Sequence, residues 1–221
     1  KTCGDALSVD VVNQLTLISP ELAEAFEYFT PKVSSYGVRI VAPNQQHIDI
    51  PFYHQGKEKC GYLCTRFDFD NLLVEQLKKS HQITLIENCQ VKKIETSTGH
   101  IKATTDEGVF VAKMMIGADG AQSVVAKFLG ASTMERKHHS AGLRVYYQNI
   151  SGFHPDRFIE LYFFNEILPG YLWIFPLPDN KANVGIGMLS DTITKKKINL
   201  RETLEKLIHT HPLLKERFQD A

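Results

Sequence analysis

The sequence lacks a long hydrophobic run, a signal-like start and an excess of either charge. No apolar segment approaches the roughly 20 residues that span a bilayer. The polar start Lys1-Thr2-Cys3-Gly4-Asp5 does not resemble a signal peptide. Twenty-five basic residues balance twenty-five acidic ones, so no overall field attracts nucleic acid. We therefore expect a cytoplasmic protein without a nucleic-acid partner, and peripheral membrane contact stays open.

Cysteine is also scarce. Cys3, Cys60, Cys64 and Cys89 are too few and too scattered for a disulfide framework, and free thiols suit a reducing compartment. Cys60 and Cys64 lack a second Cys or His pair at zinc-finger distance, so no metal site is expected.

Hydrophobic residues make up 43% of the 221 residues, which suffices for one large domain or two small ones. Helical spacing of apolar residues and alternation of apolar with polar residues divide the chain into segments. In the first half of the chain, these patterns predict helices over 9–29 with a break at Pro20, and then antiparallel strands over 33–53. They also predict a short strand at 62–64 and a helix over 68–80 that Asp68 or Asp70 caps.

From Gln82 onward the period of two predicts a strand through Ile83 and Leu85, then a three-stranded meander that leads into a strand before Gly117. Four further strands are predicted over 143–150, 158–164, 170–176 and 182–188, and helix over 199–219. The fold class is therefore mixed α and β (α/β), with a helix-plus-meander region interleaved with a region rich in antiparallel strands.

The segment Met114-Met115-Ile116-Gly117-Ala118-Asp119-Gly120-Ala121-Gln122-Ser123 predicts a buried strand, a sharp turn and a helix that Ser123 caps and Gly130 ends. Two glycines beside a carboxylate let the backbone approach a ligand closely, and such turns bind phosphate. An ordinary strand-to-helix turn with a good N-cap explains the same residues.

Four segments in this order resemble one family. They are Lys1-Thr2-Cys3-Gly4-Asp5-Ala6-Leu7, Arg66-Phe67-Asp68-Phe69-Asp70-Asn71-Leu72-Leu73, Gly117-Ala118-Asp119-Gly120 with Ser123, and Pro169-Gly170-Tyr171-Leu172-Trp173-Ile174-Phe175-Pro176 followed by Gly185-Ile186-Gly187. Together they resemble the FAD-dependent oxidoreductases of the p-hydroxybenzoate hydroxylase fold, and within them the geranylgeranyl reductase-like branch.

The resemblance implies an FAD-binding role for six residues: Arg66, Val91, Gly117, Asp119, Gly120 and Ser123. Arg66 would offer its guanidinium fork to the dinucleotide, although a surface ion pair with Asp68 or Asp70 explains it too. Val91 would contact the adenine through backbone atoms, or simply pack in the core. Asp119 would order the loop or a water molecule without touching phosphate, since two anions repel.

Tyr171, Trp173 and Phe175 alternate, so they share one face of one strand. Such a row forms either a hydrophobic core or the wall of an apolar pocket. The resemblance favours a substrate-binding pocket where a long isoprenoid or other lipid-like molecule lies near the flavin. Cys3 would lie close to the flavin ring and act in redox or proton donation, or it is a small buried structural residue.

The resemblance also implies a division into a partial FAD-binding domain (1–30 and 61–130) and a substrate-binding domain (31–60 and 131–221). Two family parts are missing: the Gly-x-Gly-x-x-Gly turn that holds the pyrophosphate, and the Gly-Asp turn that holds the ribityl chain. The chain does not start with Met. We therefore expect a piece of a longer protein that alone binds little FAD and is inactive.

The expected activity of the intact protein is reduction of carbon-carbon double bonds in a prenyl or other hydrophobic substrate. NAD(P)H and ferredoxin are both open as electron donors, and the oligomeric state is not predicted. Two alternatives remain: a flavin monooxygenase of the same fold that hydroxylates an aromatic or quinone, and a flavin-free binding module derived from such an enzyme.

Overall fold

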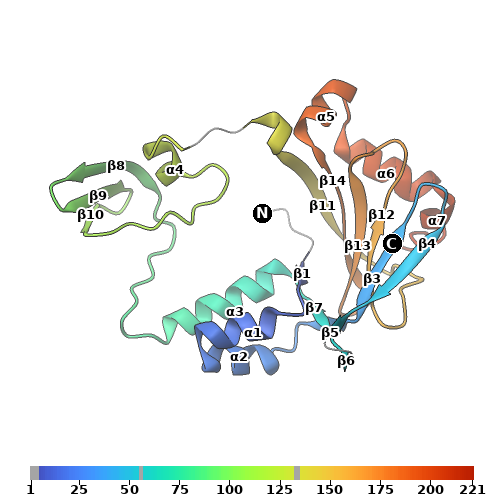
Figure 1. Cartoon of the computed structure of the whole chain (residues 1–221), viewed down its shortest axis with the longest axis horizontal. Helices are drawn as coiled ribbons and strands as arrows, with labels where there is room; N and C mark the ends of the chain where they lie inside the picture. Colours follow the sequence, from blue (N-terminus) through green and yellow to red (C-terminus); the bar gives the residue numbers. More distant parts are fainter. Residues whose placement is uncertain (1–4, 55–56, 132–134) are drawn as a thin grey trace. The chain divides into compact units, whose positions relative to one another are not determined.

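The computed structural model describes residues 5–54, 57–131 and 135–221, which form two compact units. Unit 1 comprises Lys1–Lys79 with Arg136–Ala221, and unit 2 comprises Ser80–Glu135. Both units combine helices with strands, so the predicted mixed α and β fold class is confirmed (Figure 1). No helix among the described residues is long and apolar enough to cross a bilayer.

The N-terminal part of unit 1 is a small helical layer beside a short sheet. Its helices are α1 (Val11–Ile18), α2 (Pro20–Glu27) and α3 (Arg66–Lys78). They pack around Leu15, Leu22, Phe26 and Phe69, with Cys64 buried among them. The sheet has the order β1-β7-β2 and is built from β1 (Ala6–Leu7), β7 (Gly61–Leu63) and β2 (Val33–Ser35).

The larger part of unit 1 is a six-stranded sheet of order β11-β14-β13-β12-β3-β4. Its neighbours are antiparallel except β12 and β3, which run parallel. The strands are β11 (Ser140–Gln148), β14 (Lys181–Leu189), β13 (Tyr171–Leu177), β12 (Ile159–Tyr162), β3 (Gly37–Val41) and β4 (His47–Pro51). A hairpin of β5 (Tyr53–His54) and β6 (Lys57–Glu58) follows β4.

One face of this sheet is covered by the C-terminal helices (Figure 1). After the short turn η1 (Arg136–His138) and the strands, the chain forms α5 (Ser190–Lys196), α6 (Leu200–Thr210) and α7 (Pro212–Lys215). The apolar side of α6 packs onto alternate residues of β13 and β14, and this layer is the largest core cluster of the described residues. Burial of apolar area on this scale is the main favourable contribution to folding.

Unit 2 is an antiparallel meander followed by one short helix. Its strands are β8 (Val91–Ser97), β9 (His100–Thr105) and β10 (Val109–Ala112), and its helix is α4 (Val124–Phe128). Among the described residues of this unit, the buried side chains are Ile94, Ala103 and Thr105. The core of unit 2 is therefore small.

Most predicted elements are confirmed, but one predicted helix begins at a different residue and two predicted strands are absent from the described residues. The helix predicted over 68–80 begins at Arg66, because Thr65 and not an aspartate caps it, its hydroxyl accepting from the Asp68 N–H at 3.1 Å. The strands predicted at 83–85 and before Gly117 are absent from the described chain, where Met114 and Ile116 are exposed. A strand needs a neighbouring strand to pair with, and no strand of the described residues pairs with these segments.

Candidate functional site

The turn from Gly117 to Ser123 is organised by the carboxylate of Asp119. One Asp119 oxygen accepts from the Ser123 hydroxyl at 2.5 Å, and the other accepts from the backbone N–H of Val124 at 2.6 Å. Ser123 in turn caps α4, its hydroxyl accepting from the Ala126 N–H at 2.9 Å. The Ser123 hydrogen bond lowers the pKa of the exposed Asp119 carboxyl. The predicted cap at Ser123 is confirmed, and these contacts are those that a loop-ordering role of Asp119 requires.

The two glycines of this turn serve different purposes. A Cβ atom on Gly117 would lie 2.6 Å from the Cβ atom of Val125, so Gly117 lets the turn pack tightly on α4. Gly120 has φ +79°, a conformation that residues with side chains disfavour, and apart from Gly120 and its chain neighbours no atom of the described residues lies within 4 Å of the position a Cβ would take. The backbone at Gly120 is thus open to a neighbouring molecule.

A pocket of about 360 Å³ adjoins this turn within unit 2. It is lined by Cys89, Gln90 and Val91 at the start of β8 and by the turn residues 115–119, Gln122, Val124 and Val125. The structure therefore brings predicted residues Val91, Gly117 and Asp119 to one pocket. Its volume lies at the lower end of the range of about 300–1,000 Å³ typical of ligand sites.

Arg66 belongs to unit 1, where it is the first residue of α3. Its guanidinium donates to one carboxylate oxygen of Asp70 from Nε at 2.9 Å and from Nη2 at 2.5 Å. This is the surface ion pair foreseen as an alternative, and at such exposure it contributes little to stability. Because this ion pair is solvent-accessible, a cofactor could replace Asp70 as the partner of the guanidinium. Cofactor binding by Arg66 therefore stays a prediction.

The aromatic row of β13 lies on the sheet face opposite α6. Tyr171 is 39% exposed, whereas Trp173 and Phe175 are 7% and 8% exposed and pack with Leu63 and Leu177. Successive ring centroids are 6.1 and 6.4 Å apart, so the three rings form the continuous row that the alternation predicts. The indole N–H of Trp173 donates to the buried Asn183 amide oxygen at 2.8 Å.

Gly185 and Gly187 of the neighbouring strand β14 make room for the indole ring. Trp173 pairs with Gly185 across the two strands, and a Cβ atom on Gly185 would lie 2.1 Å from the indole carbon Cζ2. At Gly187 the nearest indole atom would be 3.5 Å from a Cβ atom, which is ordinary contact. The Gly-Ile-Gly segment and the Trp are thus one packing unit.

Sequence reasoning missed a buried carboxylate at Asp5. This residue is 1% exposed and has φ +61°. Its carboxylate accepts from the Tyr146 hydroxyl at 2.6 Å, from the Arg66 backbone N–H at 3.2 Å and from Arg144 Nη1 at 3.4 Å. Burial and the hydrogen bond to Asp5 raise the pKa of Tyr146. Local pattern cannot reveal such a cluster, because the partners of Asp5 lie 61 to 141 positions away from it.

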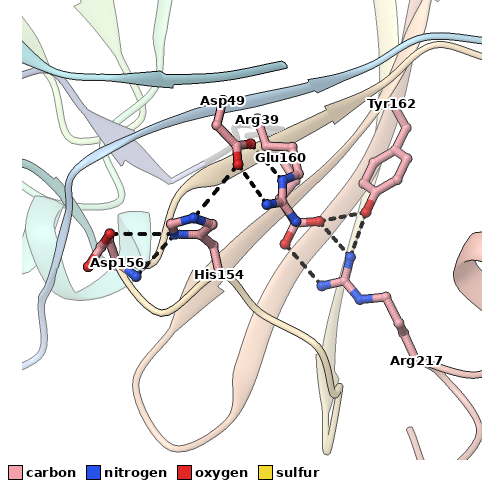
Figure 2. Close-up of polar contacts among 7 residues, drawn as sticks. All are labelled: Arg39, Asp49, His154, Asp156, Glu160, Tyr162 and Arg217. Carbon is pink, nitrogen blue, oxygen red and sulfur yellow. Dashed lines mark hydrogen bonds and ion pairs between the residues drawn. The ribbon is translucent and has the colours of Figure 1, made fainter. Parts of the chain in front are cut away.

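A second buried cluster joins the C-terminus of the chain to the six-stranded sheet (Figure 2). Both terminal nitrogens of Arg217 donate to the carboxylate of the fully buried Glu160, at 2.5 and 3.0 Å. Arg217 Nη1 also donates to the Tyr162 hydroxyl at 2.6 Å. Arg39, opposite Glu160 in the sheet, is paired with Asp49 at 2.7 and 2.8 Å. Every charge has a partner, as burial demands, so this cluster is structural.

The cysteines offer no redox pair among the described residues. Cys64 is buried, and burial raises the pKa of its thiol to about 12, so it is neutral and unreactive. Cys60 and Cys89 are free and partly exposed. Cys3, the predicted catalytic residue, lies outside the described residues.

Comparison with known proteins bears on the aromatic strand directly. Residues 139–219, which include the whole Tyr171–Phe175 row and Gly185–Gly187, match the family model of the geranylgeranyl reductase catalytic domain. The predicted resemblance to geranylgeranyl reductases is confirmed. A digeranylgeranylglycerophospholipid reductase from Methanosarcina acetivorans is 31% identical over 173 residues, which cover 73% of this chain and 40% of that protein. The chain spans about half the length of the curated relatives it matches.

Solved structures share the fold. A geranylgeranyl bacteriochlorophyll reductase-like protein from Thermoplasma acidophilum superimposes with a TM-score of 0.75 at 24% identity, over 97% of this chain and 53% of that one. A variant of the halogenase PltM, solved in complex with FAD, superimposes with a TM-score of 0.73 at 15% identity, over 99% of this chain and 50% of that one. The chain therefore shares the fold of both of these proteins.

Proposed function

We propose that the protein containing this chain is an FAD-dependent oxidoreductase that reduces carbon-carbon double bonds in a prenyl or other hydrophobic substrate. The match of residues 139–219 to the geranylgeranyl reductase catalytic domain carries this proposal, because it covers the strand with the aromatic row. The name of the Methanosarcina relative, which contains a geranylgeranylated glycerophospholipid, supports a lipid substrate. We place the protein in the cytoplasm and leave peripheral membrane contact open, and NAD(P)H and ferredoxin remain the candidate electron donors.

When bound, FAD would supply the hydride for such a reduction, and the polypeptide would bind and orient both ligands. Arg66, Val91, Gly117, Asp119, Gly120 and Ser123 are our cofactor-binding candidates. The pocket beside Val91 and the open backbone at Gly120 support the choice of those candidates that belong to unit 2. Asp119 acts there by holding the turn and α4, since its oxygens are already engaged.

Tyr171, Trp173 and Phe175 are our substrate-binding candidates, and their side chains differ in exposure. Tyr171 is the accessible member and offers a ring surface to an apolar chain, while Trp173 and Phe175 support it from beneath. Cys3 remains our candidate for the proton donor, on its sequence motif alone. In domain terms, we assign 1–30 and 61–130 to cofactor binding and 31–60 and 131–221 to substrate binding.

The test uses the full-length gene product that contains this chain. It is purified, its flavin content is read from the absorption spectrum, and it is incubated anaerobically with dithionite and a geranylgeranyl-bearing glycerophospholipid. We expect bound FAD and a product that mass spectrometry shows to have gained two hydrogen atoms for each reduced double bond. A product that gains oxygen in aerobic assays with NAD(P)H would favour the monooxygenase alternative. A full-length protein without flavin would favour the binding module and contradict the proposal.

A further inference from the structure

Asp5 combines two features that are uncommon in one residue. Its carboxylate is buried, with a side chain 0% exposed, and its φ of +61° lies in the left-handed region. Asp and Asn tolerate this region better than most residues do. The Asp5 carbonyl oxygen also accepts from the Cys64 N–H at 3.2 Å, beside the pairing of β1 with β7. Both the backbone and the side chain of Asp5 are therefore held in place.

The partners of the carboxylate come from two different elements. The Arg66 N–H belongs to the first turn of α3, whereas Arg144 and Tyr146 belong to β11 of the six-stranded sheet. Arg144 faces Gly185 on β14, and Gly185 faces Trp173 on β13, so these residues share one row of the sheet. Asp5 thus joins the start of α3 to the sheet face that carries the aromatic row.

A structural ion pair alone would account for only part of this arrangement. Arg144 and Tyr146 would balance the buried charge without the contact to α3. The Arg66 N–H is one of the donors at a helix start that the helix itself cannot satisfy, and Asp5 reaches it from 61 positions away. The side chain of Arg66, one of the proposed cofactor residues, starts from the same anchored backbone.

We infer that Asp5 is a positioning residue for the proposed cofactor site, fixing the first turn of α3, and with it Arg66, against the aromatic face of the sheet. The inference rests on the proposed function, because it assigns a consequence for FAD binding. Hydrogen bonds to a charged carboxylate are stronger than neutral ones and hold geometry more tightly. Loss of the carboxylate would remove the acceptor that the Arg66 N–H uses at 3.2 Å.

The experiment compares Asp5→Gly, Asp5→Asn and Glu160→Gln in the full-length gene product. Glycine keeps the positive φ and removes the carboxylate, whereas asparagine keeps the positive φ and an oxygen that accepts from the Arg66 N–H. Glu160→Gln is the matched control, since it also removes a buried, ion-paired carboxylate charge of unit 1. FAD affinity is measured by flavin fluorescence titration of the apoprotein, and stability by thermal melting.

We expect Asp5→Gly to weaken FAD binding about tenfold or more, equivalent to about 1.4 kcal/mol per factor of ten. Asp5→Asn should restore part of the affinity, because its amide oxygen keeps the acceptor while the charge is lost, and Glu160→Gln should lower the melting temperature while leaving FAD affinity near that of the wild type. Wild-type affinity in Asp5→Gly would overturn the inference, as would an equal loss in Glu160→Gln. If Asp5→Gly does not fold, Asp5→Ser replaces it with the same expected loss and the same overturning result. A wild-type protein that binds no FAD would instead contradict the proposed function itself.

Discussion

At the scale of single residues, the aromatic row separates into an accessible and a buried part. Trp173 is 7% exposed, fills the space above Gly185 and has its N–H bound to Asn183. Truncating it to alanine would cost the roughly 3–5 kcal/mol typical of a buried aromatic, so such a variant reports on folding. Tyr171 is 39% exposed and is the better probe of substrate contact.

We therefore predict that Tyr171→Ala in the full-length protein raises the KM for a prenyl substrate several-fold and changes the melting temperature little. The control is Tyr28→Ala, which removes another exposed tyrosine at the C-cap of α2, on a different element from the row. Steady-state kinetics and thermal melts on both variants give the answer. Equal kinetic effects of the two changes would remove Tyr171 from the substrate-binding candidates.

Local sequence was informative about residues whose partners are near in the chain. The Ser123 cap is predicted from a hydroxyl placed just before an apolar helix. The N–H that donates to this hydroxyl belongs to Ala126, three residues away. Asp5 and Glu160 were not found, because their partners Tyr146 and Arg217 come from distant segments. A lone acidic residue has no local signature of burial, so only the three-dimensional fold identifies it as a buried charge.

At the scale of elements, strands that pair with a neighbouring strand were predicted well, whereas segments without a paired strand were wrongly predicted as strands. The strands β11, β12, β13 and β14 pair with one another or with β3, and all were expected. The segments 83–85 and 114–116 have strand-like composition but no partner among the described residues. Their apolar side chains are largely exposed, and composition cannot supply the missing backbone hydrogen bonds.

The packing of β13 against β14 leads to a prediction at this scale. Gly185→Ala should destabilise the protein by about 1–3 kcal/mol or more, because the added methyl overlaps the indole ring and the Leu143 carbonyl oxygen. Gly187→Ala, two residues along the same strand and face, should cost far less, since its nearest contact is at 3.5 Å. Urea unfolding followed by far-UV circular dichroism compares the two. Equal midpoints would contradict the proposed packing of Trp173 over Gly185.

At the scale of the whole molecule, the two units differ in the interactions that stabilise each of them internally. Unit 1 contains the three core clusters and both buried ion-pair clusters. Among the described residues of unit 2, a single large aliphatic side chain, Ile94, is buried, while Val109, Phe110 and Val111 of β10 are exposed. Since buried apolar area is the main source of stability, unit 2 should be the weaker unit.

The last prediction concerns unfolding of this 221-residue chain. Trp173 is its single tryptophan and lies in unit 1, so tryptophan fluorescence reports on unit 1, whereas far-UV circular dichroism reports on both units. We expect circular dichroism to begin to change at lower urea than fluorescence does, because unit 2 opens first and two-state behaviour fails. Limited proteolysis at low urea should accordingly cut within 80–135 before other segments. Coincident transitions together with cleavage outside 80–135 would show that the two units unfold as one cooperative body.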